Sequence, residues 1–192
     1  MADNFLRIFI SPEELTDDEA ETVTDLLDNG LWDMAHLRHP SASLTEMRHL
    51  IEAIPQRLHR RLRIHGHFSL AAEFNLGGLH LNRRCPEVPS FYSGPVSRSC
   101  HSIAETVAST DCDYVTLSPV FDSISKPGYK SAFTDKDLKH INGIKTPRIV
   151  ALGGITPERI DAVKEYGFGG YAVKEIGRAV ALFTKNFSNT LQ

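Results

Sequence analysis

The chain has 192 residues, of which 41% are hydrophobic, and this is enough to bury the core of one compact domain. Its 21 basic and 24 acidic residues are mixed along the chain and give a net charge of −3, which argues against a nucleic-acid partner. Three cysteines without a C-x-x-C spacing predict free thiols, and no apolar run is long enough for a membrane span. With no basic N-terminal leader, the expected location is the cytoplasm.

Short apolar runs rich in β-branched residues alternate along the chain with amphipathic segments. The first expected helix begins at a capping box formed by Thr16 and Glu19 and ends at Gly30. Later helices are expected to begin at Ser43, Ser69, Ser102, Thr134 and Thr156, with a further helix at the end of the chain. Strands are expected at 6–10, 32–38, 63–65, 79–81, 95–99, 114–117, 148–152 and 171–173.

Strict alternation of strands and helices predicts parallel strands joined by right-handed crossovers, either in a closed barrel or in an open doubly wound sheet. Eight such units favour a single compact (β/α)8 TIM barrel over residues 1–192. Because these barrels usually have about 200 residues or more, some helices are expected to be short or missing. The doubly wound sheet remains the alternative.

Two glycines mark the clearest candidate for a ligand site. Gly153 and Gly154 end the strand 148–152, just before the helix at Thr156. Glycines leave backbone amides accessible, and barrels often bind phosphate at the loops after the last two strands. We therefore predict a phosphate site at Gly153 and Gly154, close to Val173 and Lys174. In the alternative interpretation, the glycines only relieve crowding in a tight turn.

The long segment from Pro119 to Phe133 follows another strand and contains Ser123, Ser125 and Lys126. Long loops in compact domains are usually functional, so this loop is predicted to hold an anion and close over substrate, although the same residues also suit a solvated loop. His101 follows the strand 95–99, where a barrel places catalytic residues and where an imidazole can move a proton. The alternative is a capping or packed histidine.

A metal site is not expected. His65, His67 and His80 lie on or beside two strands, but no carboxylate accompanies them and Gly66 offers no ligand. Cys100 and His101 are adjacent on a strand and point to opposite faces, so they do not form a nucleophile and base pair.

Six segments together resemble the thiamine-phosphate synthase/TenI family, in order and at matching spacing over about residues 6–180. The resemblance implies a TIM barrel that binds a small-molecule thiazole phosphate. A homo-oligomer is compatible with the resemblance but is not implied by it. The segments are Ala35–Arg38, Gly78–Leu81, Arg98–Ser102, Asp113–Lys126, Val150–Ile155 and Gly170–Val173.

The sequence departs from the synthase branch, which joins a pyrimidine diphosphate to a thiazole phosphate. Where that branch has a glutamine and a lysine for the diphosphate, this chain has His36 and Pro40. Where it has an Asn-Asp pair and a later aspartate for diphosphate and Mg²⁺, this chain has His65, Gly66 and Cys85. Glycine and a thiol are poor partners for so hard a cation.

The tautomerase (TenI) branch is closer, through His36, Arg38, Gly66 and His101. The resemblance thus implies an isomerase that aromatises a thiazole carboxylate phosphate, with no cofactor and with His101 as the proton shuttle. Mg²⁺ is expected only if the chain is instead a thiamine-phosphate synthase. The implied substrate contacts are His36, Arg38, His65, Ser99, Ser123, Ser125 and Lys126, and the phosphate contacts are Gly153, Gly154, Val173 and Lys174.

Two further alternatives remain. The chain could be a non-catalytic regulatory barrel that binds thiazole phosphate, or a barrel enzyme of tryptophan or histidine synthesis that shares the phosphate site. One departure concerns every branch of the family. Lys174 and Glu175 replace small or hydroxyl residues after the last strand, and a carboxylate there would repel a phosphate unless it points away.

Overall fold

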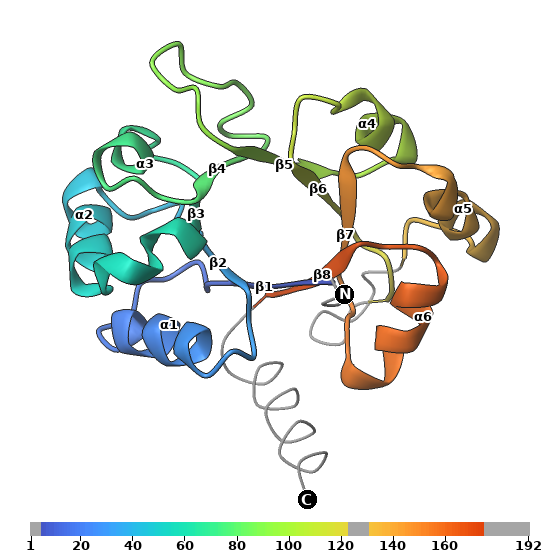
Figure 1. Ribbon diagram of the computed structural model, residues 1–192, viewed down its shortest axis with the longest axis horizontal. Helices are drawn as coiled ribbons and strands as arrows, with labels where there is room; N and C mark the ends of the chain where they lie inside the picture. Colours follow the sequence, from blue (N-terminus) through green and yellow to red (C-terminus); the bar gives the residue numbers. More distant parts are fainter. Residues whose placement is uncertain (1–4, 123–130, 175–192) are drawn as a thin grey trace, which may run out of the picture.

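The computed structural model describes residues 5–122 and 131–174, in which strands alternate with helices around a ring (Figure 1). The strands are β1 (Leu6–Ile10), β2 (Met34–Leu37), β3 (Leu62–Ile64), β4 (Gly78–Leu81), β5 (Val96–Cys100), β6 (Tyr114–Leu117), β7 (Arg148–Leu152) and β8 (Gly170–Lys174). The α-helices are α1 (Glu19–Asp28), α2 (Leu44–Ala53), α3 (Ser69–Glu73), α4 (Ile103–Ala108), α5 (Asp135–Lys139) and α6 (Ile160–Glu165). Short 3₁₀-helices lie at Gln56–Arg61, His140–Gly143 and Pro157–Arg159.

The eight strands form a closed parallel barrel in chain order, which confirms the predicted (β/α)8 fold. Closure occurs where β1 pairs with β8 as well as with β2, with Leu6 opposite Gly170. A Cβ atom at position 170 would lie 2.2 Å from the carbonyl oxygen of Leu6, so only glycine permits this approach.

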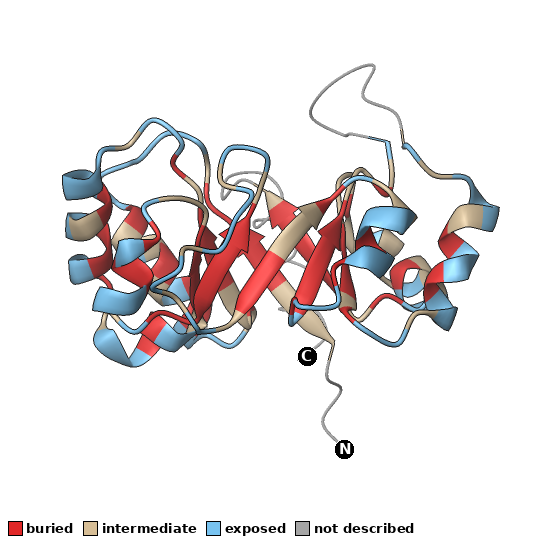
Figure 2. Cartoon of the chain, turned by 90° about the horizontal axis from the view of Figure 1, so that it is seen from above, coloured by how far each residue is buried: buried red, intermediate tan, exposed pale blue. Residues whose placement is uncertain are grey.

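Alternate strand residues face two different cores, as the period of two in a β-strand requires. Ile8, Tyr114 and Val150 pack inside the barrel, whereas Phe9 and Val115 belong to the larger core between strands and helices. Figure 2 shows buried strands at the centre and exposed outer faces on the helices. Residues on β1, β6, β7 and β8 are buried on both faces: Ile8, Phe9, Val115, Leu117, Ile149, Val150, Ala172 and Val173.

Helix caps were predicted correctly at three positions and wrongly at one. The side chains of Ser43, Ser102 and Thr134 each accept a bond from the backbone amide three residues later. The predicted capping box of Thr16 and Glu19 does not form, because α1 begins at Glu19 itself. The Glu19 side chain is fully buried and bonds to a histidine instead of capping the helix.

The small size of the chain is explained by short outer helices. The α-helices α3 to α6 have five or six residues each, and residues 82–95 between β4 and β5 contain no helix. The three cysteines are free, as predicted. Among the described residues, no helix is long and apolar enough to cross a membrane. The predicted terminal helix lies outside the described residues.

Candidate functional site

Most of the predicted site residues lie at the carboxyl ends of the strands, which meet at one end of a parallel barrel. His36 and Lys174 are both opposite Ile10 in the strand register, so β1 joins these two parts of the rim. Ser123, Ser125 and Lys126 lie outside the described residues, and their predicted contacts stay predictions.

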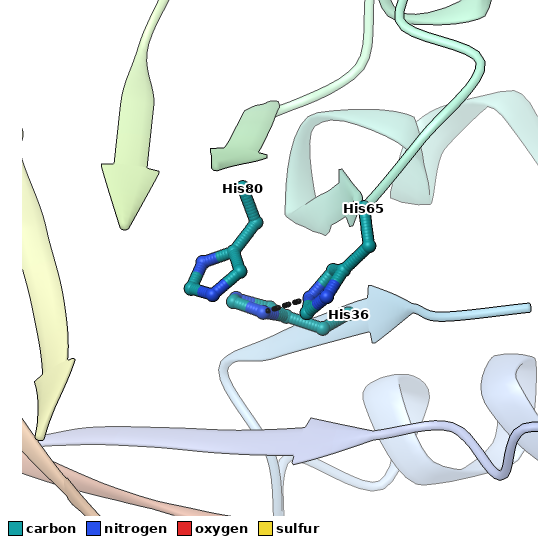
Figure 3. A group of neighbouring side chains, drawn as sticks. All are labelled: His36, His65 and His80. Atoms are coloured by element: carbon teal, nitrogen blue, oxygen red, sulfur yellow. Dashed lines mark hydrogen bonds between the residues drawn. The ribbon is translucent and has the colours of Figure 1, made fainter. Parts of the chain in front are cut away.

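Three histidines from β2, the end of β3 and β4 gather inside the barrel (Figure 3). Each offers a ring nitrogen, and these three nitrogens lie within 4.8 Å of one another. The His36 Nδ1 atom is 2.9 Å from His65 Nε2, and the rings of His65 and His80 stack with centroids 4.2 Å apart. His36 and His80 are buried, and His65 is partly exposed.

Polar partners surround this histidine cluster. His36 Nε2 is 2.5 Å from the Tyr114 hydroxyl oxygen. The two ring nitrogens of His80 contact the hydroxyls of Ser97 and Ser99 at 2.9 and 2.8 Å. The predicted substrate residue Ser99 therefore bonds to His80, a residue that the sequence did not assign to substrate.

The histidine cluster is uncharged at neutral pH. Burial lowers the pKa of His80 to about 3, with smaller contributions from Arg63 and Arg98. Burial and the neighbouring rings also lower the pKa of His36 and His65 well below the ordinary value. Burial raises the pKa of Tyr114 to about 12, so its hydroxyl stays protonated.

His101 lies apart from the histidine cluster, exposed at the end of β5. Its Nδ1 atom is 3.0 Å from the backbone carbonyl oxygen of Ser118. Because a carbonyl only accepts, this contact requires a proton on Nδ1 and leaves Nε2 with a lone pair when the ring is neutral. The backbone amide of His101 donates to Glu105 at 2.6 Å, which fixes the start of α4 beside it.

A carboxylate that the sequence analysis missed joins two of the predicted cations. Glu13 Oε1 is 2.8 Å from Arg38 Nη1 and 2.9 Å from Lys174 Nζ. The Lys174 and Arg38 charges lower the pKa of Glu13 to about 2, although its side chain is 48% exposed. Glu13 comes three residues after the end of β1, and this position at the rim could have marked it as a candidate site residue.

Gly153 and Gly154 pack against the backbone that follows β6. Both have positive φ angles, 95° and 65°. The Gly153 carbonyl accepts from the Phe121 amide, and the Gly154 carbonyl accepts from Arg159 at 2.6 Å. A Cβ atom at 154 would lie 2.4 Å from the Asp122 carbonyl oxygen. Relief of crowding is thus a sufficient reason for these glycines, and a phosphate role stays a prediction.

Of the other predicted phosphate contacts, Val173 turns its side chain into the core between strands and helices, so only its backbone could meet an anion. An open cavity of about 760 Å³ lies between α4 and the segment that joins β4 to β5. Ser99, His101, Arg83 and Arg98 are among the residues that line it. Figure 1 shows this segment projecting from the ring beside the region of α4.

A family model described as thiamine monophosphate synthase matches residues 7–176. The chain belongs to the thiamine-phosphate synthase/TenI family. This family membership confirms the resemblance found in the sequence and places the chain among enzymes of thiamine biosynthesis.

Individual members of the family show how far the similarity extends. The crystal structure of thiamine phosphate pyrophosphorylase from Bacteroides thetaiotaomicron is 30% identical, with a TM-score of 0.80 over 98% of this chain and 100% of the other. A putative thiamine-phosphate synthase 2 of Aquifex aeolicus is 29% identical over 79% of this chain and 86% of its own length. The thiamine-phosphate synthase of Levilactobacillus brevis is 28% identical over 54% of this chain, a match that spans about half of that protein. These names favour the synthase over the tautomerase.

The positions that would hold Mg²⁺ in a synthase do not suit the ion here. A side chain at Gly66 would meet open space, so room for a carboxylate exists, but the chain supplies none. At the other position, Cys85 is half-buried and offers only a thiol. At the positions where the resemblance implies a magnesium site, the described residues therefore offer no carboxylate.

The expectation of no metal site considered His65, His67 and His80, which have no carboxylate beside them and a glycine at 66, and it stays a prediction. His67 is exposed and bonds to the Ala42 carbonyl, away from the histidine cluster. The third histidine near His65 and His80 is His36, which comes from β2. Three imidazoles thus converge on one point.

Proposed function

We propose that this chain is a thiamine-phosphate synthase, which joins a pyrimidine diphosphate to a thiazole phosphate at the carboxyl end of the barrel. The observation that carries the proposal is the similarity to the Bacteroides thetaiotaomicron pyrophosphorylase over the full length of both chains. The names of the Aquifex aeolicus and Levilactobacillus brevis relatives support the same reaction.

In this proposal the thiazole phosphate binds to the turn after β7. Successive amides in a backbone with positive φ form a concave site for an anion. Gly153 and Gly154 have positive φ angles, and β8 pairs with β7 up to Leu152 and Ala172, so Val173 and Lys174 follow beside this turn. Lys174 would add positive charge once a phosphate competes with Glu13 for it.

The coupling reaction releases diphosphate, whose charge must be stabilised as it leaves. Of the two histidines at the positions that the resemblance assigns to the diphosphate, His36 is buried with its ring nitrogens against His65 and Tyr114. His65 is partly exposed and neutral, so it is the one placed to donate a hydrogen bond without adding charge. Arg38 is the cation on that side of the rim, and its side chain is 27% exposed. We assign it the contact with the leaving group, in exchange for its bond to Glu13.

The geometry of His101 favours a second candidate, the tautomerase. Aromatisation removes a proton from the ring carbon that bears the carboxylate and delivers one to the exocyclic alkene carbon. An imidazole can do both in turn. Since Nδ1 of His101 contacts the Ser118 carbonyl, Nε2 is the nitrogen available for this transfer.

One pair of assays separates the candidates. The purified chain is supplied with pyrimidine diphosphate and thiazole phosphate, with and without Mg²⁺, and thiamine phosphate and diphosphate are measured by mass spectrometry. The non-aromatic thiazole tautomer is supplied in a parallel reaction. Coupling supports the synthase. Tautomerisation without coupling supports the second candidate, and binding of thiazole phosphate without turnover would leave only a regulatory barrel.

The second candidate has its own test at His101. His101→Gln should slow tautomerisation by about 10²- to 10⁴-fold, the usual contribution of a positioned acid-base group. The matched control is His140→Gln, because His140 is also exposed and its Nδ1 also contacts a backbone carbonyl. Equal rates in the two variants would remove His101 from the reaction.

A further inference from the structure

We propose that His36, His65 and His80 bind a divalent transition-metal ion of the Zn²⁺ class through three imidazole nitrogens. The proposal does not rest on the proposed function, although His36 and His65 also lie on its diphosphate side, and its ligands differ from the carboxylates that the resemblance implies for Mg²⁺ in the synthase branch. It lies inside the carboxyl half of the barrel, between neighbouring strands (Figure 3).

The first support is the spacing of the ligand atoms. Zn–N bonds of about 2.0–2.1 Å in a tetrahedral site place two ligand nitrogens about 3.3 Å apart. Here the three nitrogens lie within 4.8 Å of one another, and His36 Nδ1 and His65 Nε2 are 2.9 Å apart. The spacing is close to that of a tetrahedral site, and rotation of the rings is the movement that would bring all three nitrogens to one ion.

The second support is that hydrogen bonds orient the rings, as they do around bound metals. The Ser97 hydroxyl donates its one proton to the Leu79 carbonyl, so it can only accept from His80 Nδ1. This bond places the proton of His80 on Nδ1, so Nε2 has a lone pair that accepts from the Ser99 hydroxyl at 2.8 Å. His80 is therefore held in the tautomer that a metal requires.

The same logic applies to His36. Its Nε2 contacts the Tyr114 hydroxyl, and in the tautomer with the proton on Nε2 that bond is donated to Tyr114. Nδ1 then has its lone pair toward His65 and the centre of the cluster. In these tautomers each ring uses one nitrogen for orientation. The other nitrogen, Nδ1 of His36 or Nε2 of His80, would exchange its present contact with His65 or Ser99 for a bond to the ion.

The surroundings select the class of ion. Imidazole is a preferred ligand of Zn²⁺, Cu²⁺, Ni²⁺ and Co²⁺, whereas Mg²⁺ requires oxygen ligands. Three protein ligands leave one coordination position open, as in catalytic rather than structural zinc sites. His65 is the partly exposed member, so access is on its side. The nearby cation Arg63 is already paired with Asp113 at 2.6 Å.

The competing explanation is a set of packed histidines that only bond to one another. The two explanations differ in whether the purified protein binds a metal ion stoichiometrically. The full chain is stripped with a chelator, dialysed and titrated with Zn²⁺ by calorimetry, and separately with Co²⁺ by absorption spectroscopy. We expect one equivalent of Zn²⁺ to bind, and we expect Co²⁺ to give the intense d–d bands of a four-coordinate site.

Variants assign that binding to the histidine cluster. His65→Asn removes one ligand at the partly exposed position, where the fold tolerates change best. Ser97→Ala removes only the orienting bond to His80 and should weaken affinity by about 10- to 100-fold, as loss of such a partner does elsewhere. His65→Asn should weaken it more. The control is His67→Asn, which changes the next histidine in the chain and keeps its positive φ of 49° accessible.

A thermal melt of each variant shows whether it is folded, and added Zn²⁺ should raise the melting temperature of the parent and of His67→Asn but not of His65→Asn. Absence of stoichiometric Zn²⁺ or Co²⁺ binding by the folded parent would overturn the proposal. Binding that persists in folded His65→Asn would overturn it as well. None of these measurements requires turnover, so a chain that binds metal but fails the coupling assay contradicts the proposed function alone.

Discussion

Around the rim of the barrel, the β7–β8 side and the β2–β4 side use different groups. On the first, backbone amides at Gly153 and Gly154 are the candidate ligand groups, and their position depends on the close approach of the segment after β6. On the second, three imidazoles, two of them buried, form the cluster, and those two depend on hydroxyl partners from β5 and β6. A backbone site is sensitive to any added atom, whereas a side-chain cluster is sensitive to the loss of one partner.

The largest expected effect tests the backbone at the glycine turn, on the β7–β8 side of the rim. Gly154→Ala places Cβ at 2.4 Å from the Asp122 carbonyl oxygen, in a conformation with φ of 65°. The conformational and steric costs together should lower the free energy of unfolding by about 2–5 kcal/mol, measured by urea denaturation.

Gly30→Ala is the matched control, because Gly30 has φ of 72° with nothing near its Cβ position. It should lose only the conformational part, about 1–2 kcal/mol. Equal losses of unfolding free energy in the two variants would mean that the segment after β6 moves away from the added Cβ atom at no energetic cost. A larger residue at 154 would disturb this packing whether or not phosphate binds there. Loss of binding in Gly154→Val would therefore not by itself locate the anion site.

The next largest effect tests the histidine cluster on the β2–β4 side of the rim. Ser97→Ala leaves the buried Nδ1 proton of His80 without an acceptor, which should cost about 1–3 kcal/mol of unfolding free energy. Ser99→Ala removes the other hydroxyl on the same ring, but Ser99 is only half-buried and water can replace it. Denaturation of both variants should show the larger loss at Ser97, and the reverse order would contradict the assigned tautomer of His80.

The smallest effect concerns Glu13, which joins the two sides through Arg38 and Lys174. A carboxylate whose folded pKa is depressed to about 2 stabilises the protein above its usual pKa of 4.5 and loses that contribution as pH falls toward 2. Because Glu13 is exposed, the loss should stay below about 1 kcal/mol. Glu13→Gln should remove this acid dependence from melts recorded between pH 4.5 and 2.

The same variant frees two cations for an anionic ligand. Phosphate affinity, measured by calorimetry, should rise by no more than about fivefold, since an exposed ion pair is worth at most about 1 kcal/mol. Glu14→Gln is the control, because it changes the net charge equally at the neighbouring exposed position. An equal gain in both variants would show a general charge effect rather than release of Arg38 and Lys174.

By itself, the sequence determined the eight strands, three of the helix caps and the closed barrel, because these depend on hydrophobic period and local hydrogen bonds. It also determined the family, through segments spread over most of the chain. It failed at Thr16, where local capping geometry competes with a tertiary contact that buries Glu19 against His39. The cap pattern at that position carries no information about burial.

Only the tertiary structure decided which side chains meet inside the barrel. His36, His65 and His80 are separated by 29 and 15 positions in the chain, and the register of β2, β3 and β4 brings their rings together. The alternation of a strand predicts that a side chain points inward. The relative height of two inward side chains depends on the stagger between strands, which is set by packing over the whole barrel. For the same reason, Glu13 and its two cations were visible only once the ends of β1, β2 and β8 were in place.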